Sequence, residues 1–198
     1  EENARFILDS MVQDQELYRS WKEGEVRVPA FLEDHAGLGN GLLTLYEATL
    51  NEDWLFEAQS LADRILDRFW SPEDGVLFDS SHEGEELVMR PRDPMDNATP
   101  SGNSLAVELF LRLHAVLGEE EYRTRAHEVL NSELDTAIQL PSAFGRLLSV
   151  THRTLEPPVE IAILGEARDP ELQNLLGAAH QAFVPNRVLA GGPPDPKS

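Results

Sequence analysis

Two groups of polar side chains in this sequence have the chemistry needed to bind or transform a small polar molecule. Glu33, Asp34 and His35 are consecutive at the start of an expected helix, and the second group lies in residues 90–104. Histidine titrates near neutral pH, and a carboxylate can move a proton or protonate a leaving oxygen. The residues that we expect to act directly on a substrate are His35, Asp34 and Asp96.

The segment of residues 90–104 is expected to be an ordered loop that supplies most of the binding groups. It contains three prolines, one glycine and almost no large apolar side chain, so it does not form the interior of a helix or a strand. Polar loops between regular elements often carry function. The side chains expected to bind a ligand are Trp21, Arg27, Glu33, Arg90, Asp93, Asn97, Thr99, Ser101 and Asn103.

Together these residue types are those that a carbohydrate site requires. Carboxylates accept hydrogen bonds from hydroxyl groups, and the aromatic face of Trp21 would cover the C–H side of a sugar ring. We therefore expect a carbohydrate-active site that carries out isomerisation, epimerisation or a related proton transfer. The histidines have no metal-ligand spacing with carboxylates, and no dinucleotide fingerprint follows Gly165, so we predict no metal and no cofactor.

The same residues also have structural explanations. Acidic side chains in the first turn of a helix are favoured by its dipole, by about 0.3–1 kcal/mol each. Serine and asparagine before a helix are ordinary caps. Arg90 or Arg92 beside Asp93 or Asp96 would pin the loop by ion pairs, and a histidine at a helix start is often a packed residue.

The charge of the chain argues against two classes of partner. It has 36 acidic and 16 basic residues and a formal net charge of −20. Such a chain repels the phosphates of nucleic acids and anionic lipids, so we expect neither nucleic acid nor a membrane as a partner. It has no cysteine and no apolar run long enough to span a bilayer. Because nothing in it argues for secretion, we expect a cytoplasmic location.

The elements that must position these side chains are predicted to be mostly helices. Two β-hairpins are expected, at residues 17–28 and 76–89, each before one of the apolar helices. Three glycines inside one helix, Gly37, Gly39 and Gly41, each cost roughly 1 kcal/mol relative to alanine, so a neighbour should pack closely against them. Hydrophobic periodicity predicts helices over residues 1–11, 31–50, 54–69, 101–117, 119–136 and 141–155.

An internal repeat sets the predicted architecture. Trp54 and Tyr122 lie 68 positions apart, and Ala58 and Ala126 are related by the same offset. Each copy reads as a hairpin, a buried helix, a tight turn and an amphipathic helix, and such units must stack on neighbours. We therefore predict a mostly α fold in which residues 1–156 form the C-terminal half of an α/α toroid, an (α/α)6 barrel.

The composition changes after Pro157 and Pro158, where a small α/β tail is predicted. Strand, helix and strand are expected at residues 159–164, 169–183 and 187–190, so residues 157–190 would form a βαβ unit. Asp169 would cap the helix, and Pro170 would occupy its first position. Residues 191–198 are expected to be frayed.

Several of these segments resemble the C-terminal part of the spermatogenesis-associated protein 20 family. The resemblance covers nearly the whole chain, and its most specific part is the run Asp-Asn-Ala-Thr-Pro-Ser-Gly-Asn-Ser. The segments that carry it are residues 31–36, 42–48, 90–93, 96–104 and 184–186.

The resemblance implies a fold and a substrate class without a mechanism. Members of the family join an N-terminal thioredoxin-like domain to an α/α barrel similar to N-acylglucosamine 2-epimerases and six-hairpin glycosidases. Neither the thioredoxin-like domain nor about half of the barrel helices is present in this sequence. We therefore expect a fragment whose partners are those missing parts and a small-molecule carbohydrate. Its inner helices should expose apolar faces near Leu38, Leu42 and Leu109.

Two functional classes follow from this sequence. The first is a carbohydrate-active barrel with its site at the end of the molecule where the β-hairpins lie. The second is a non-catalytic scaffold or interaction module of a protein that carries a thioredoxin-like domain. A deep, open funnel at the hairpin end would favour the first class if it is lined by Trp21, His35, Asp34 and Asp96, and a filled or covered funnel would favour the second.

Overall fold

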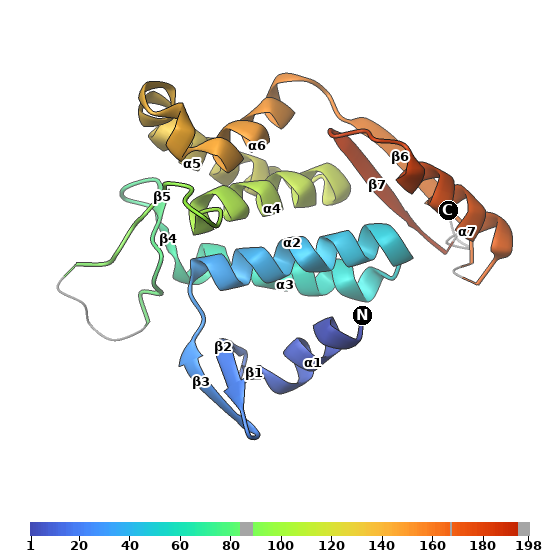
Figure 1. Cartoon of the computed structure of the whole chain (residues 1–198), viewed down its shortest axis with the longest axis horizontal. Helices are drawn as coiled ribbons and strands as arrows, with labels where there is room; N and C mark the ends of the chain where they lie inside the picture. The colour runs from blue at the N-terminus through green and yellow to red at the C-terminus, as the bar shows by residue number, and fades with distance from the viewer. Residues whose placement is uncertain (84–88, 167, 194–198) are drawn as a thin grey trace.

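The computed structural model of the chain describes residues 1–83, 89–166 and 168–193 (Figure 1). Within these residues the chain is mostly helical, as predicted, with short strands between the helices. The elements are α1 (Glu2–Ser10), β1 (Val12–Gln13), β2 (Glu16–Lys22), β3 (Glu25–Pro29), α2 (Leu32–Thr49), α3 (Glu52–Arg68), β4 (Trp70–Ser71), β5 (Val76–Leu77), α4 (Gly102–Leu117), α5 (Glu120–Gln139), the 3-10 turn η1 (Pro141–Ala143), α6 (Gly145–Leu155), β6 (Val159–Leu164), α7 (Pro170–Gln181) and β7 (Arg187–Gly192).

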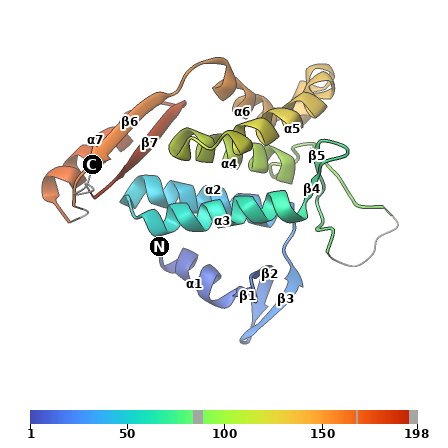
Figure 2. The ribbon, with the colours of Figure 1, turned by 180° about the vertical axis from the view of Figure 1, so that it is seen from behind.

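Two helical hairpins, α2–α3 and α4–α5, form the centre of the molecule. Helices α2 and α4 lie side by side, with α3 against α2 and with α5 and α6 against α4 (Figures 1 and 2). The predicted repeat coincides with this arrangement, because Trp54 and Tyr122 are both buried, as are Ala58 and Ala126. Consecutive hairpins thus bury their apolar faces against each other, while the complete barrel remains a prediction.

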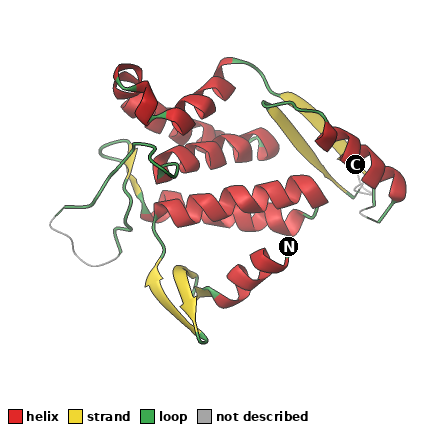
Figure 3. Ribbon diagram, viewed as in Figure 1, coloured by secondary structure: helices red, strands yellow, loops and turns green. Residues whose placement is uncertain are grey.

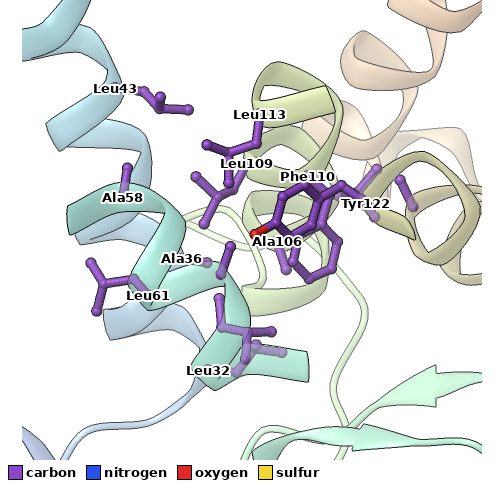
Figure 4. Close-up of a cluster of buried hydrophobic side chains, with 14 of the residues drawn as sticks. Leu32, Ala36, Leu43, Ala58, Leu61, Ala106, Leu109, Phe110, Leu113 and Tyr122 are labelled. Carbon is purple, nitrogen blue, oxygen red and sulfur yellow. The ribbon is translucent and has the colours of Figure 1, made fainter. Parts of the chain in front are cut away.

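The main hydrophobic core lies between these helices. Its largest fully buried side chains include Leu32 and Leu109 from α2 and α4, and Phe110, whose ring stacks on Tyr122 with centroids 5.9 Å apart (Figure 4). Leu42 and Leu109 are 1% and 0% exposed. The expectation that the inner helices expose apolar faces near Leu38, Leu42 and Leu109 is therefore wrong for Leu42 and Leu109, and Leu38 is half-buried against the same core. Leu109 is covered because it packs against Gly39 of α2.

The prediction that a neighbour packs closely against the glycines of α2 is confirmed only in part. A Cβ atom on Gly39 would lie 2.6 Å from Cδ2 of Leu109, so the close approach of α4 requires glycine at this position. No atom lies within 4 Å of the place that a Cβ would take on Gly37 or Gly41, and both glycines are exposed. The close packing that we predicted for three glycines is found at one.

The first predicted β-hairpin is present, and the second has different partners (Figure 3). Strands β2 and β3 are antiparallel, joined by Glu23 and Gly24, which both have positive φ as a tight hairpin turn requires. Strand β5 pairs with β4, the segment expected to end the preceding helix, instead of with residues 86–89. Residues 86–88 lie outside the described residues, and Met89 is not in a strand.

The C-terminal tail forms the predicted strand–helix–strand unit. Strands β6 and β7 are parallel, and α7 connects them with Asp169 as its cap and Pro170 at its first position. The tail packs on the end of α2 through Leu50 and Leu189, and residues 191 and 192, which we expected to be frayed, complete β7. Residues 194–198 of the predicted frayed end lie outside the described residues.

Candidate functional site

A pocket of about 300 Å³ lies at the N-terminal ends of α2 and α4. The two helix starts touch, because a Cβ on Gly102 would lie 3.0 Å from the backbone nitrogen of Glu33. The loop that precedes α4 closes one side of the pocket, next to the β4–β5 hairpin. The polar residues that line it are Glu33, Asp79, Asp93, Asn97, Thr99 and Ser101.

Five of the residues predicted to bind a ligand meet in this pocket, namely Glu33, Asp93, Asn97, Thr99 and Ser101. They come from the first turn of α2 and from the loop before α4, as the sequence indicated. The loop holds its shape through local hydrogen bonds. Asp93 Oδ1 accepts from the Met95 nitrogen at 3.1 Å, and the Asn97 nitrogen donates to the Thr99 carbonyl at 3.0 Å.

Asp96 connects this loop to helix α6. Its Oδ1 accepts from the Ser101 nitrogen at 2.9 Å, and its Oδ2 accepts from the nitrogens of Arg146 and Leu147 at 2.7 and 3.1 Å. Asp96 is half-buried and is not among the residues lining the pocket. Three backbone N–H groups thus engage both oxygens of a residue that we expected to be catalytic.

Asp34 and Ser101 cap the two helices that meet at the pocket. Asp34 Oδ2 accepts from the Phe31 nitrogen at 2.9 Å, and Asp34 also pairs with Arg19 at 3.5 Å. Ser101 Oγ accepts from the Ser104 nitrogen at 3.1 Å and caps α4, as predicted. Asp34 is therefore held at the helix start beside the pocket, outside its lining.

His35 and Asn103 point into the protein interior. Both are 0% exposed, and neither lines the pocket. The Nδ1 of His35 donates to the Phe31 carbonyl at 3.0 Å, so Nε2 carries the lone pair. Among the described residues, Nε2 of His35 and both amide atoms of Asn103 are buried without a partner. Burial lowers the pKa of His35 below its ordinary value, partly offset by the bond to Phe31.

The remaining three predicted binding residues lie away from the pocket. Trp21 packs edge-on against Phe6 of α1, with ring centroids 5.3 Å apart. Arg27 pairs with Glu25 of the same exposed strand, β3. Arg90 donates to the carbonyls of Ser80 and Arg68, and its guanidinium lies over Phe78. The position of Trp21 against α1 removes the predicted aromatic platform.

Asp79 is the pocket residue that the sequence did not reveal. Its Oδ2 accepts from the Asp93 nitrogen at 2.8 Å, and its carbonyl accepts from the Leu32 nitrogen at 3.0 Å. Burial raises the pKa of the Asp79 carboxyl above its ordinary value, and the negative charges of Asp93 and Glu33 add to the effect. A carboxylic acid with a raised pKa is a candidate proton donor.

Two further properties of the described residues concern metals and membranes. No group of three or more His, Asp or Glu side chains in them is arranged to hold a metal ion. None of the helices that the structure describes has the length and apolar character needed to cross a membrane.

The fold and the pocket define a class of protein: stacked helical hairpins with a carboxylate-lined pocket where the central helices begin. No family model matches the chain. Over 172 residues, 85% of this chain, it is 36% identical to spermatogenesis-associated protein 20 of Mus musculus and 34% identical to the protein of that name in Homo sapiens. It is also 27% identical over 195 residues to an uncharacterised protein of Caenorhabditis elegans.

These similarities confirm the family resemblance: over most of its length the chain is homologous to spermatogenesis-associated protein 20. The chain spans 21% of the mouse protein and 22% of the human one, about a fifth of their length.

Proposed function

We propose that the pocket at the start of α2 and α4 binds a carbohydrate and carries out an isomerase- or epimerase-type proton transfer. The observation that supports this most is the half-buried Asp79, whose pKa is raised, in a pocket that also contains Glu33 and Asp93. A volume of about 300 Å³ is at the lower end of the range for small-molecule sites, which suits a monosaccharide.

The proposed chemistry assigns different protonation states to neighbouring carboxyl groups. Asp79, whose protonated form is favoured by burial and by its acidic neighbours, donates its proton to a carbonyl or ring oxygen of the sugar. Glu33 or Asp93, each of which is more exposed, removes a proton from the adjacent carbon. Asn97, Thr99 and Ser101 hydrogen-bond the hydroxyl groups. Asp79 takes the part in proton transfer that we expected of Asp96, because both oxygens of Asp96 are engaged by backbone N–H groups.

The test is a binding titration of glucose, mannose, N-acetylglucosamine and maltose, read by ligand-observed NMR, followed by turnover assays on a full-length relative. Asp79→Asn should abolish turnover while keeping the fold, since the amide oxygen still accepts from the Asp93 nitrogen. Because the folded-state pKa of Asp79 is raised, the ionised form is disfavoured, and Asp79→Asn should leave the melting temperature at pH 7 unchanged or higher.

The control is Glu25→Gln, which makes the same chemical change at an exposed strand residue outside the pocket. It should change neither binding nor turnover. If Asp79→Asn lowers the melting temperature by several degrees and none of the four sugars binds, the carboxylates of this pocket serve the fold and the proposal fails.

A specific observation also supports the second functional class, an interaction module. The tail carries large apolar side chains that are exposed, including Leu164, Leu175 and Phe183 at 72%, 61% and 92%. Exposed apolar surface of this kind marks protein contacts. Under this alternative, the thioredoxin-like domain of a full-length relative would bind the chain saturably, and Leu175→Ser with Phe183→Ser would weaken binding. Absence of saturable binding would exclude it.

A further inference from the structure

A second cavity lies at the other end of α2 and α4 from the pocket described above. Its volume is about 520 Å³, and it is bounded by the later turns of α2, α4 and α6 and by residues 180–187 of the tail. In Figure 1 this is the end where β7 approaches the two central helices. Its charged lining residues are Glu47, Glu108, Arg112, Arg153 and Arg187.

Each of the two carboxylates that line this cavity, Glu47 and Glu108, forms an ion pair with an arginine. Arg112 Nη2 lies 3.1 Å from Glu47 Oε1, and its Nη1 donates to the Asn40 carbonyl at 3.0 Å. Glu108, which is 7% exposed, accepts from two nitrogens of Arg146 through its Oε2. The negative charges of the cavity are thus matched by Arg112 and Arg146, and Arg146 reaches Glu108 from outside the lining.

Arg187 is held in the cavity by neutral acceptors. Its Nη1 donates to the Ala179 carbonyl at 2.6 Å, and its Nη2 lies 2.7 Å from Nδ1 of His180. His180 Nε2 in turn lies 3.0 Å from the Glu47 carbonyl, which can only accept. His180 is therefore the neutral tautomer with its proton on Nε2. No carboxylate forms an ion pair with Arg187 among the described residues.

Arg153 is the second cation of the cavity, and its ion pair with Glu108 is a long one to a carboxylate that Arg146 already engages. Its Nη2 donates to the Arg187 carbonyl at 3.3 Å, and its Nη1 is 3.7 Å from Glu108 Oε1, which is beyond hydrogen-bond distance. Burial lowers the pKa of Arg153, and the positive charges of Arg112 and Arg146 lower it further, against the raising effect of Glu108 and Glu47. Glu108 is thus shared between Arg146 and Arg153, and the lining arginines Arg112, Arg153 and Arg187 outnumber the lining carboxylates Glu47 and Glu108.

We propose that the cavity between α2, α4, α6 and the tail is a binding site for the phosphate group of a small molecule, held by Arg153 and Arg187. Guanidinium groups form paired hydrogen bonds with phosphate oxygens and are more weakly hydrated than ammonium groups, so arginine suits this role. The excess positive charge occurs in a chain whose net charge is −20, which makes the cavity unusual on this molecule. Its volume exceeds that of phosphate alone and leaves room for an organic group.

The experiment measures binding of inorganic phosphate to the whole chain by calorimetry, with sodium acetate and sodium chloride at equal ionic strength as references. Phosphate should bind saturably and raise the melting temperature, and neither acetate nor chloride should do so. Arg153→Gln and Arg187→Gln should each weaken the dissociation constant for phosphate about tenfold or more, because each removes a charge-assisted donor.

Arg27→Gln is the matched control, since Arg27 is an exposed arginine paired with Glu25 outside the cavity. It should keep the wild-type dissociation constant within about twofold. Arg187→Lys keeps the positive charge but not the planar fork, and it provides a second variant if Arg187→Gln does not fold. It should bind phosphate with intermediate affinity. Circular dichroism spectra of all variants establish that they fold.

The site assignment is overturned if folded Arg153→Gln and Arg187→Gln bind phosphate as the wild type does. It is equally overturned if acetate binds as well as phosphate, or if Arg27→Gln loses as much affinity. Asp79→Asn, which alters the carbohydrate pocket at the opposite helix ends, should bind phosphate normally, so failure of one proposal is distinguishable from failure of the other.

Discussion

His35 illustrates how the environment of a residue decides whether its chemistry is available. The ring lies against Phe69, with centroids 5.1 Å apart, and is completely buried. One nitrogen bonds the Phe31 carbonyl, and the other has no partner among the described residues. These buried surroundings favour the neutral imidazole over the charged one. Protonation of His35 at low pH should therefore destabilise the folded protein.

We predict that His35→Leu makes the stability of the protein less sensitive to acid. The pKa of His35 is lowered below 6.5 in the folded protein, while the unfolded chain keeps a value near 6.5. Between the two values the unfolded chain binds more protons, so the free energy of unfolding falls as the pH falls below about 6.5. Urea unfolding of both proteins at a series of mildly acidic to neutral pH values measures the two slopes.

The quantity to compare is the difference in unfolding free energy between the wild type and His35→Leu at each pH, because the two proteins share all other titrating groups. A difference that stays constant with pH would show that His35 does not couple protonation to folding. His152→Leu, at an exposed helix position, should reproduce the wild-type slope.

The role of a site residue could be predicted from the sequence when its surroundings come from residues nearby in the chain. It could not be predicted when the fold brings distant residues together. Ser101 was predictable as a cap because the signal lies within four residues of sequence. Asp79 was not, because its raised pKa depends first on burial and then on the charges of Asp93 and Glu33, and only the fold determines these surroundings. Trp21 had suitable chemistry, but its position depends on α1, whose packing on the hairpin the sequence did not reveal.

At the scale of elements, the contact between α2 and α4 depends on glycines at two points, Gly102 at the helix starts and Gly39 further along α2. Gly39 lies where Leu109 of α4 crosses α2, and Leu109 is fully buried, so a methyl group at Gly39 would press on its side chain. We predict that Gly39→Ala lowers the free energy of unfolding by about 1–3 kcal/mol, because overpacking outweighs the gain in helix propensity of about 1 kcal/mol. Chemical denaturation measures the change.

Gly37 and Gly41 provide the matched controls within the same helix. At neither position does any atom lie within 4 Å of where a methyl group would sit, so alanine there should stabilise the protein by about 0.5–1 kcal/mol. If all three substitutions stabilise the protein equally, the close approach of α4 at Gly39 does not constrain the fold.

The hairpins were predicted with uneven success for a physical reason. The β2–β3 hairpin has long strands and a Glu23-Gly24 turn, so its signal is local and the hairpin could be predicted from the sequence. Strands β4 and β5 are two residues each, too short for an alternating pattern to select their partner. The pairing of Val76 with Ser71 follows from the end of α3 and the turn at Gly75.

At the scale of the whole molecule, the helical class and the order of elements were predictable, since periodicity extends over many residues in each helix. The docking of the tail on the bundle was not, because no pattern in sequence links Tyr46 to β7. Tyr46 donates its hydroxyl hydrogen to the Gly191 carbonyl and accepts from the Gly191 nitrogen, both at 3.0 Å. This pair of bonds joins α2 to the last strand.

We predict that Tyr46→Phe loosens the tail and leaves the helical core intact. The change removes two hydrogen bonds of a buried tyrosine, which together stabilise the docked state by about 1–2 kcal/mol. Amide hydrogen exchange in residues 187–192 should then accelerate roughly 5- to 30-fold, while exchange in α2 and α4 is unchanged. Tyr18→Phe, the same substitution on strand β2, should alter neither region. Equal acceleration in the core and the tail would instead mean that the two parts open as one unit, because Leu50 and Leu189 would then couple them more strongly than the Tyr46 bonds do.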